Sequence, residues 1–186
     1  MNDLMFYFGK LDFDVRSYFT NFNFSKGKRR KYEATSFASD NTKIKLFTTD
    51  LEEDDYFRVN ISNYINNVLQ LDYAEAGISY YPPILKNDDA AVTSWHQDTH
   101  LGYLSRHNLT SMIKDEDRFT KLARYWIPLT DSAFGHYFEI TNGKERIIKT
   151  NWESGDVFRV FPNNPHIAAN LGFNSSIKMI ITGVIR

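Results

Sequence analysis

Two histidines and one aspartate stand where their side chains could bind a single metal ion. His96 and Asp98 are two residues apart in the segment Trp95-His96-Gln97-Asp98, and His166 follows a Pro-containing turn far downstream. In a β-strand, residues two apart point to the same face, so an imidazole and a carboxylate can reach one ion together. We therefore predict that His96, Asp98 and His166 are metal ligands.

The types of these ligands indicate which metal they suit. The sequence of 186 residues contains 0 Cys, so it has no thiolate ligand and no disulfide. Two His and one carboxylate on one side of an ion leave the opposite positions open for a bidentate organic acid and for dioxygen, which suits Fe(II). A closed structural zinc site usually needs four protein ligands. His100 is an alternative ligand if the strand continues past Asp98.

The elements that position these residues follow from the hydrophobic pattern. Residues 51–70 should form an amphipathic helix packed on a flat surface, with Asp50 and Glu53 as a capping box. Its apolar stripe recurs at spacings of three and four residues and consists of Phe57, Ile61, Tyr64, Ile65 and Val68.

Short strand-like runs follow the predicted helix and are separated by Gly, Pro, Asn and Asp. They cover residues 77–81, 94–98, 122–129, 137–141, 145–149, 156–161, 166–170 and 176–184. Many short strands after one or two helices indicate an antiparallel sandwich or barrel. Residues 102–121 interrupt them with polar side chains, which predicts a loop or short helix that covers a site.

The composition and charge of the chain indicate which kinds of partner the protein binds. The formal net charge is -1 and the pI is about 6.5, which does not indicate a nucleic-acid or anionic-membrane surface. The basic run at residues 26–31 is interpreted as a solvated loop. No segment has the pattern of a secretion signal or a membrane span. We expect one cytoplasmic domain, residues 1–186, with a small-molecule or peptidyl partner; the sequence does not indicate its oligomeric state.

The order of the motifs resembles the iron(II)/2-oxoglutarate-dependent oxygenase superfamily, and within it the free-proline hydroxylases and aspartyl/asparaginyl β-hydroxylases. The resemblance covers about Gly77 to Ile185. It rests on a Tyr-bearing strand (78–81), W-H-x-D (95–98), R-Y-W-I-P-L (124–129), G-D-V-F-R-V-F (155–161) and P-H-x-x-x-N (165–170).

This resemblance implies a mostly β (α+β) fold with a double-stranded β-helix core, a cupin-like jelly roll, at residues 76–186. Residues 1–75 would form an N-terminal helical support region packed on one sheet. It also implies Fe(II) as cofactor, 2-oxoglutarate as co-substrate and O2 as oxidant. The implied reaction is oxidative decarboxylation of 2-oxoglutarate coupled to hydroxylation of a C–H bond.

The resemblance also indicates which residues bind the co-substrate. Family members carry an Arg or Lys beyond the second His that pairs with the distal carboxylate of 2-oxoglutarate. The aligned position here is Ser176, and Lys178 lies two residues on, on the same strand face. Arg124 is a second candidate, because its guanidinium can bind a carboxylate bidentately. Of the adjacent tyrosines only one can face the pocket, and we assign Tyr80 to it.

Several alternatives stay open. The chain could be a cupin-type metalloenzyme that does not use 2-oxoglutarate, or a catalytically silent jelly-roll binding module. Arg124 could instead pair with Asp131 or another acid. His107 and His136 are interpreted as bystanders, although His107 lies in the inserted segment and could touch substrate. By analogy alone, the substrate is a free amino acid such as proline, with a peptidyl residue as the alternative.

Overall fold

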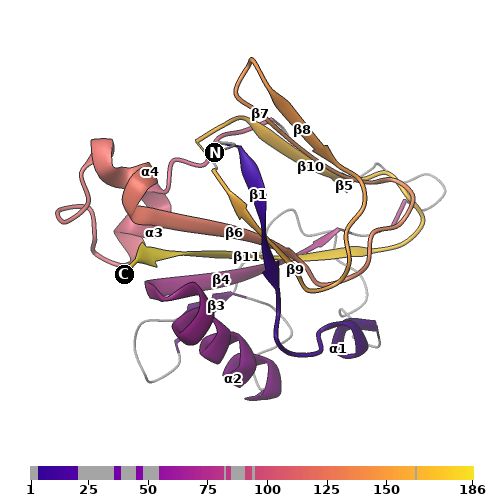
Figure 1. Ribbon diagram of the computed structural model, residues 1–186, viewed down its shortest axis with the longest axis horizontal. Coiled ribbons are helices and arrows are strands. Elements are labelled where there is room, and N and C mark those ends of the chain that lie inside the picture. Colours follow the sequence, from indigo (N-terminus) through magenta and orange to yellow (C-terminus); the bar gives the residue numbers. More distant parts are fainter. Residues whose placement is uncertain are drawn as a thin grey trace.

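Two β-sheets face each other in the computed structural model, which describes residues 4–20, 36–38, 45–47, 55–81, 83–84, 91–93, 95–161 and 163–186 (Figure 1). The larger sheet has the strand order β1 (Met5–Lys10), β9 (Asp156–Val160), β6 (Leu122–Pro128), β11 (Ser176–Ile185), β4 (Leu71–Tyr81), β3 (Lys45–Phe47) and β2 (Ser36–Ala38). The smaller sheet has the order β5 (Ala91–Val92), β10 (His166–Asn170), β7 (His136–Thr141) and β8 (Arg146–Lys149). This architecture confirms the predicted mostly β, jelly-roll fold.

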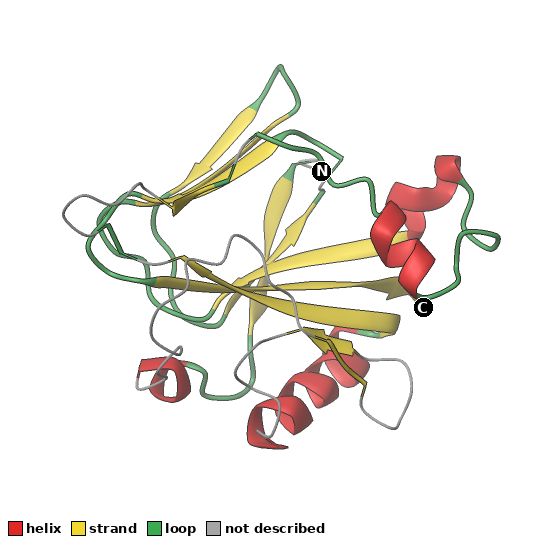
Figure 2. Cartoon of the chain, turned by 180° about the vertical axis from the view of Figure 1, so that it is seen from behind, coloured by secondary structure: helices red, strands yellow, loops and turns green. Residues whose placement is uncertain are grey.

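Short helices cover one face and one end of the larger sheet. The described helices are α1 (Arg16–Thr20), α2 (Asp55–Tyr64), a π-helical turn (Ile65–Leu69), α3 (Leu101–Arg106), a 3-10 turn (Asp115–Asp117) and α4 (Arg118–Lys121). Figure 2 shows α2 beneath the larger sheet, on the side away from the smaller sheet, and α3 and α4 at one end of the strands. Within the described residues, every helix is too short or too polar to cross a bilayer.

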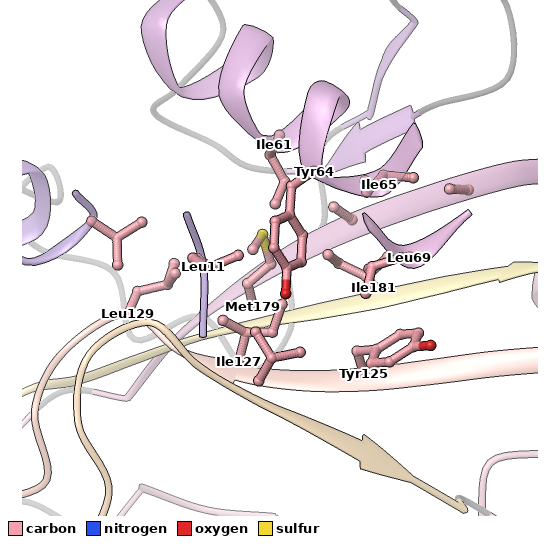
Figure 3. Packing of buried hydrophobic residues seen from close by; sticks show 14 of the residues in the cluster. Leu11, Ile61, Tyr64, Ile65, Leu69, Tyr125, Ile127, Leu129, Met179 and Ile181 are labelled. Carbon is pink, nitrogen blue, oxygen red and sulfur yellow. The ribbon is translucent and has the colours of Figure 1, made fainter. Parts of the chain in front are cut away.

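Alternation along β11 sends its side chains to two different environments. Ile177, Met179 and Ile181 belong to the apolar cluster beneath the larger sheet. Figure 3 shows Tyr64 of α2 reaching toward Met179 in this cluster. Lys178 and Ile180 point the other way, into the space between the sheets. Because successive strand residues alternate, one strand both anchors the supporting helix and lines the candidate site.

The predicted amphipathic helix is present, with one correction. Phe57, Ile61 and Ile65 are each at most 1% exposed, as the stripe predicts, whereas Val68 is 42% exposed. The helix passes into a π-helical turn at Ile65, and a π turn holds more residues than an α turn. The extra residue rotates Val68 outward and brings Leu69 onto the buried face. The predicted capping residues lie outside the described part of the chain.

The predicted helical support region at residues 1–75 also contains strands. Met5–Lys10 forms β1, which pairs antiparallel with β9 and has a bulge between Tyr7 and Gly9. This strand was not predicted, because its aromatic residues do not alternate with polar ones and its partner lies far along the chain. The predicted basic loop at residues 26–31 falls outside the described residues.

Candidate metal centre

His96, Asp98 and His166 converge at one end of the space between the sheets. Each side chain offers one ligand atom, and these atoms all lie within 4.8 Å of one another. The Nε2 atom of His166 lies 3.3 Å from the Oδ2 atom of Asp98. The alternative ligand His100 is not part of this group; it is buried at the start of α3 with a left-handed φ of 59°.

A single β-bridge holds the two histidines together. The amide of His96 donates to the carbonyl of His166 at 3.1 Å, and the amide of His166 donates back at 2.9 Å. Their ring centroids are 4.3 Å apart. Beyond this bridge the chain is irregular, so the predicted strand through Asp98 did not form. The bridge aligns the histidines, and the turn toward α3 brings the carboxylate to them.

The backbone fixes which nitrogen of His166 is available to a metal. Its Nδ1 atom lies 2.9 Å from the carbonyl oxygen of Asn164. Because a carbonyl only accepts hydrogen bonds, Nδ1 carries the proton and donates it. Nδ1 is therefore engaged by the backbone, and Nε2, the atom that faces Asp98, is the nitrogen left for a metal. Such an outer contact orients a metal-binding imidazole and raises its basicity.

Arg124 adjoins the carboxylate of Asp98. Its Nη2 atom lies 2.9 Å from Asp98 Oδ2, and its Nη1 atom donates to the hydroxyl of Thr182 at 3.4 Å. Burial raises the pKa of Asp98, but the contact with His166 and the charge of Arg124 outweigh it and lower the pKa to about 2. The carboxylate of Asp98 is thus ionised at neutral pH and lies between the guanidinium of Arg124 and the imidazole of His166.

A cavity of about 70 Å³ runs from the histidines into the space between the sheets. A water molecule needs roughly 10–15 Å³ on this scale, so the cavity has room for several such groups, the size of a small organic acid. Both sheets contribute to its wall, which includes His96, His166, Arg124, Tyr81, Phe138 and Lys178.

Lys178 lies in this cavity with its amine enclosed. The residue is 2% exposed, and its Nζ atom has no hydrogen-bond partner among the described residues. Three aromatic rings surround it: the centroids of Tyr81, Trp152 and Trp126 are 4.6, 5.4 and 5.5 Å from Nζ. The hydroxyl of Ser176, two residues before it on β11, is likewise buried without a partner. Burial lowers the pKa of Lys178 to about 7.

The structure corrects one expectation about this cavity. Tyr81 lines it, whereas Tyr80 pairs with Ile177 on the other face of the sheet and is 38% exposed. Arg124 pairs with Asp98, which agrees with the alternative that it pairs with Asp131 or another acid; Asp131 itself pairs with Arg16. Trp152 was not predicted, because it lies in a loop before β9, where no periodic pattern marks a buried position.

A second polar cluster joins the inserted segment to the larger sheet. Glu75 of β4 accepts hydrogen bonds from Arg106 of α3 and lies 3.2 Å from Nε2 of His107. The side chain of His107 is 5% exposed, so it is buried against Glu75. His136, the other predicted bystander, is buried too: its Nδ1 accepts from the amide of Ala133 and its Nε2 donates to the carbonyl of Asn174.

Comparison with known proteins gives similarity in structure only. No protein-family model matches the chain, and no curated protein matches its sequence. AviO1 from Streptomyces viridochromogenes Tue57 superposes with a TM-score of 0.51 at 13% identity, over 98% of this chain and 90% of that chain.

Two other solved structures match less of the molecule. A Pseudomonas putida prolyl-4-hydroxylase has a TM-score of 0.40 and 17% identity, over 71% of this chain and 61% of that chain. EvdO2 from Micromonospora carbonacea var. aurantiaca, complexed with 2-oxoglutarate, has a TM-score of 0.41 and 11% identity, over 73% of this chain and 62% of that chain. The chain thus spans less than two thirds of either. The comparison therefore shows that the chain shares its fold with AviO1; the grouping of His96, Asp98 and His166 is an observation on this chain itself.

Proposed function

We propose that the chain is a non-haem iron(II) and 2-oxoglutarate-dependent dioxygenase that hydroxylates a C–H bond of a small substrate. The observation that carries this proposal is one cavity lined both by the two histidines of the His-Asp-His group and by a buried amine that has no hydrogen-bond partner among the described residues. A dicarboxylic 2-oxo acid has the complementary chemistry, because one end chelates a metal and the other is a free carboxylate.

The three grouped side chains would hold the metal. Two imidazoles and one carboxylate are a donor set that suits Fe(II) and leaves coordination positions open. When bound, iron together with 2-oxoglutarate and O2 supplies the oxidising chemistry, which the protein directs onto the substrate. His166 presents Nε2 because Nδ1 is engaged by Asn164, and Arg124 orients the carboxylate of Asp98.

Lys178 would bind the distal carboxylate of 2-oxoglutarate, with the hydroxyl of Ser176 as a second donor. Both groups are buried without partners among the described residues, which is costly unless a ligand completes them. Arg124 is the weaker candidate for this role, because its guanidinium already contacts Asp98 at the metal end. Tyr81 and Trp126 would flank the bound co-substrate.

The alternatives explain less of the site. A cupin-type metalloenzyme without 2-oxoglutarate would use the three ligands but leave the buried amine of Lys178 without a role. A silent binding module would need neither the three grouped side chains nor the buried amine. The substrate, proposed to be a free amino acid such as proline or a peptidyl residue, would enter beside the inserted segment that follows Asp98.

The test is succinate formation from 2-oxoglutarate with Fe(II), O2 and a panel of free amino acids and short peptides. His96→Ala and Asp98→Ala should reduce succinate to the background of iron alone. Gln97→Ala is the matched control, because Gln97 lies between the two ligands but is exposed and donates to the carbonyl of Asn163. Equal loss in all three variants, or no loss in the ligand variants, would contradict the proposal.

A further inference from the structure

The amine of Lys178 is enclosed in a cavity that offers it no anion. No described residue that lines the cavity is an Asp or a Glu. Asp98 lies at the metal end, where Arg124 and His166 are its partners. A buried ammonium without a counter-ion is strongly disfavoured, so the neutral amine is the form that this surrounding favours.

Three aromatic rings moderate this preference. Nζ lies 4.6 Å from the centroid of Tyr81, 5.4 Å from that of Trp152 and 5.5 Å from that of Trp126. Aromatic faces attract a cation, so they keep the ammonium form within reach without supplying a negative charge. The amine is therefore placed where an incoming carboxylate decides its protonation.

We propose that 2-oxoglutarate binds to this site together with one proton from solvent, which converts the neutral amine of Lys178 into the ammonium that holds the distal carboxylate. This inference rests on the proposed function and adds how binding of the co-substrate depends on pH. At Lys178 the only covalent bond that forms is the new N–H, and the charge of the proton balances that of the distal carboxylate.

The pH dependence follows from the direction of the shift. Because burial lowers the pKa of Lys178 to about 7, the free protein already carries the proton below this pH and lacks it above. The dissociation constant for 2-oxoglutarate should thus be level below about pH 7 and rise about tenfold per pH unit above it.

Other ionisable groups face the same cavity and must be separated from Lys178. Arg124 on β6 stays charged throughout this range. Tyr81 on β4, His96 and His166 line the cavity, and His136 lies nearby on β7. Both ring nitrogens of His136 are engaged, and burial lowers its pKa, so it should remain neutral. Uptake of a proton at the histidines would accompany the binding of any 2-oxo acid, whereas uptake at Lys178 would need the distal carboxylate. Two ligands that differ in this carboxylate therefore distinguish the two sites of uptake.

The experiment is anaerobic calorimetry of the Fe(II)-loaded protein with 2-oxoglutarate, repeated in buffers of different ionisation enthalpy. We expect uptake of about one proton per ligand at pH 8, falling to about half at pH 7. The matched ligand is 2-oxopentanoate, which keeps the chelating end and lacks the distal carboxylate, so it should bind without this uptake. Lys178→Arg, whose guanidinium is always charged, should bind 2-oxoglutarate with no uptake and no rise in the dissociation constant.

Each outcome has one meaning. Binding of 2-oxoglutarate that is independent of pH and takes up no proton would overturn this inference and leave the proposed function standing. Equal uptake with both ligands would also overturn it, because the proton would then enter at the metal end. Failure of 2-oxoglutarate to bind at any pH would instead remove the proposed function. The comparison of the two ligands needs only the wild-type protein, so it holds even if Lys178→Arg folds poorly.

Discussion

Asp98 and Lys178 are both ionisable side chains in the same enclosed space, but their surroundings differ. The carboxylate of Asp98 has a guanidinium at 2.9 Å and an imidazole at 3.3 Å. The amine of Lys178 faces aromatic rings and has no hydrogen-bond partner among the described residues. Asp98 Oδ2 thus has two charged or polar groups close by, although it makes no hydrogen bond within the described part of the chain, whereas Lys178 has neither a hydrogen bond nor an acidic side chain among the described residues of its cavity.

This difference makes Lys178 a residue that favours binding at the expense of stability. At pH 6, Lys178→Met should raise the free energy of unfolding of the ligand-free protein by about 1–3 kcal/mol, because it removes a buried polar group without partners. The gain should shrink as the pH rises above 7, since the native amine is then neutral while the unfolded one is still charged. Urea denaturation at several pH values measures this difference.

The same variant, Lys178→Met, should weaken binding of 2-oxoglutarate by about 30-fold or more. Removal of one member of a buried charge pair lowers the binding free energy by at least about 2 kcal/mol. Arg124→Met is the comparison: because Arg124 contacts Asp98, it should weaken 2-oxoglutarate and 2-oxopentanoate alike. A stable Lys178→Met protein with unchanged binding, together with an Arg124→Met protein that loses affinity only for 2-oxoglutarate, would transfer the anchor to Arg124.

At this scale the sequence predicted that His96, Asp98 and His166 lie together, and the structure groups them. Their role as metal ligands, and that of Lys178 as an anchor, stay predictions. The choice between Tyr80 and Tyr81 was wrong, because a strand pattern shows that neighbours alternate but not which one faces the cavity. The contact between Arg124 and Asp98 depends on the turn into α3, which no local pattern specifies.

Among the elements, helix α2 with its π-helical turn supports the larger sheet from the side away from the site. Ile61 is 0% exposed and Val68 is 42% exposed, although the helical pattern assigned both to one stripe. Ile61→Ala should lower the free energy of unfolding by about 2–5 kcal/mol, because it leaves a cavity against the strands. Val68→Ala should change it by less than about 0.5 kcal/mol. Similar losses in urea denaturation would show that the π turn does not rotate Val68 outward.

The inserted segment is a separate element whose position depends on Glu75. Glu75→Gln should weaken the attachment of α3, because a neutral amide cannot pair with the guanidinium of Arg106 as a carboxylate does. We expect amide hydrogen exchange in α3 to rise about tenfold, while exchange in β6 and β11 stays unchanged. Arg146→Gln, which removes an exposed partner of Glu139 on the smaller sheet, is the control. Unchanged exchange in α3 would show that apolar packing alone holds it.

Most strands were predicted because period-two alternation is a local property, and β6, β7, β8, β9, β10 and β11 match the expected runs within one or two residues. The segment around Asp98 was predicted as a strand but forms only one β-bridge, between His96 and His166. How far this pairing extends depends on the distant strand β10, which a local pattern does not show. β1 was missed because its pairing with β9 is a long-range contact.

For the whole molecule, the two faces of the larger sheet have different surroundings. The outer face of the larger sheet is closed by α2 and its apolar cluster, and the inner face meets the smaller sheet (Figure 1). The central strand β11 belongs to both environments, so the position of Lys178 is fixed by a strand that pairs along most of its length with β4 and β6. A rigid strand of this kind can hold a single amine at a set place relative to the metal ligands.

The most direct measurement is the visible absorption of the anaerobic protein with Fe(II) and 2-oxoglutarate. We predict the weak metal-to-ligand charge-transfer band of a chelated 2-oxo acid in the wild-type protein and in Gln97→Ala. We predict no band in His96→Ala, Asp98→Ala or His166→Ala. A band of full strength in His166→Ala would contradict a shared metal site formed by these three side chains. Iron bound to the wild-type protein without any band would instead contradict chelation of 2-oxoglutarate at this site.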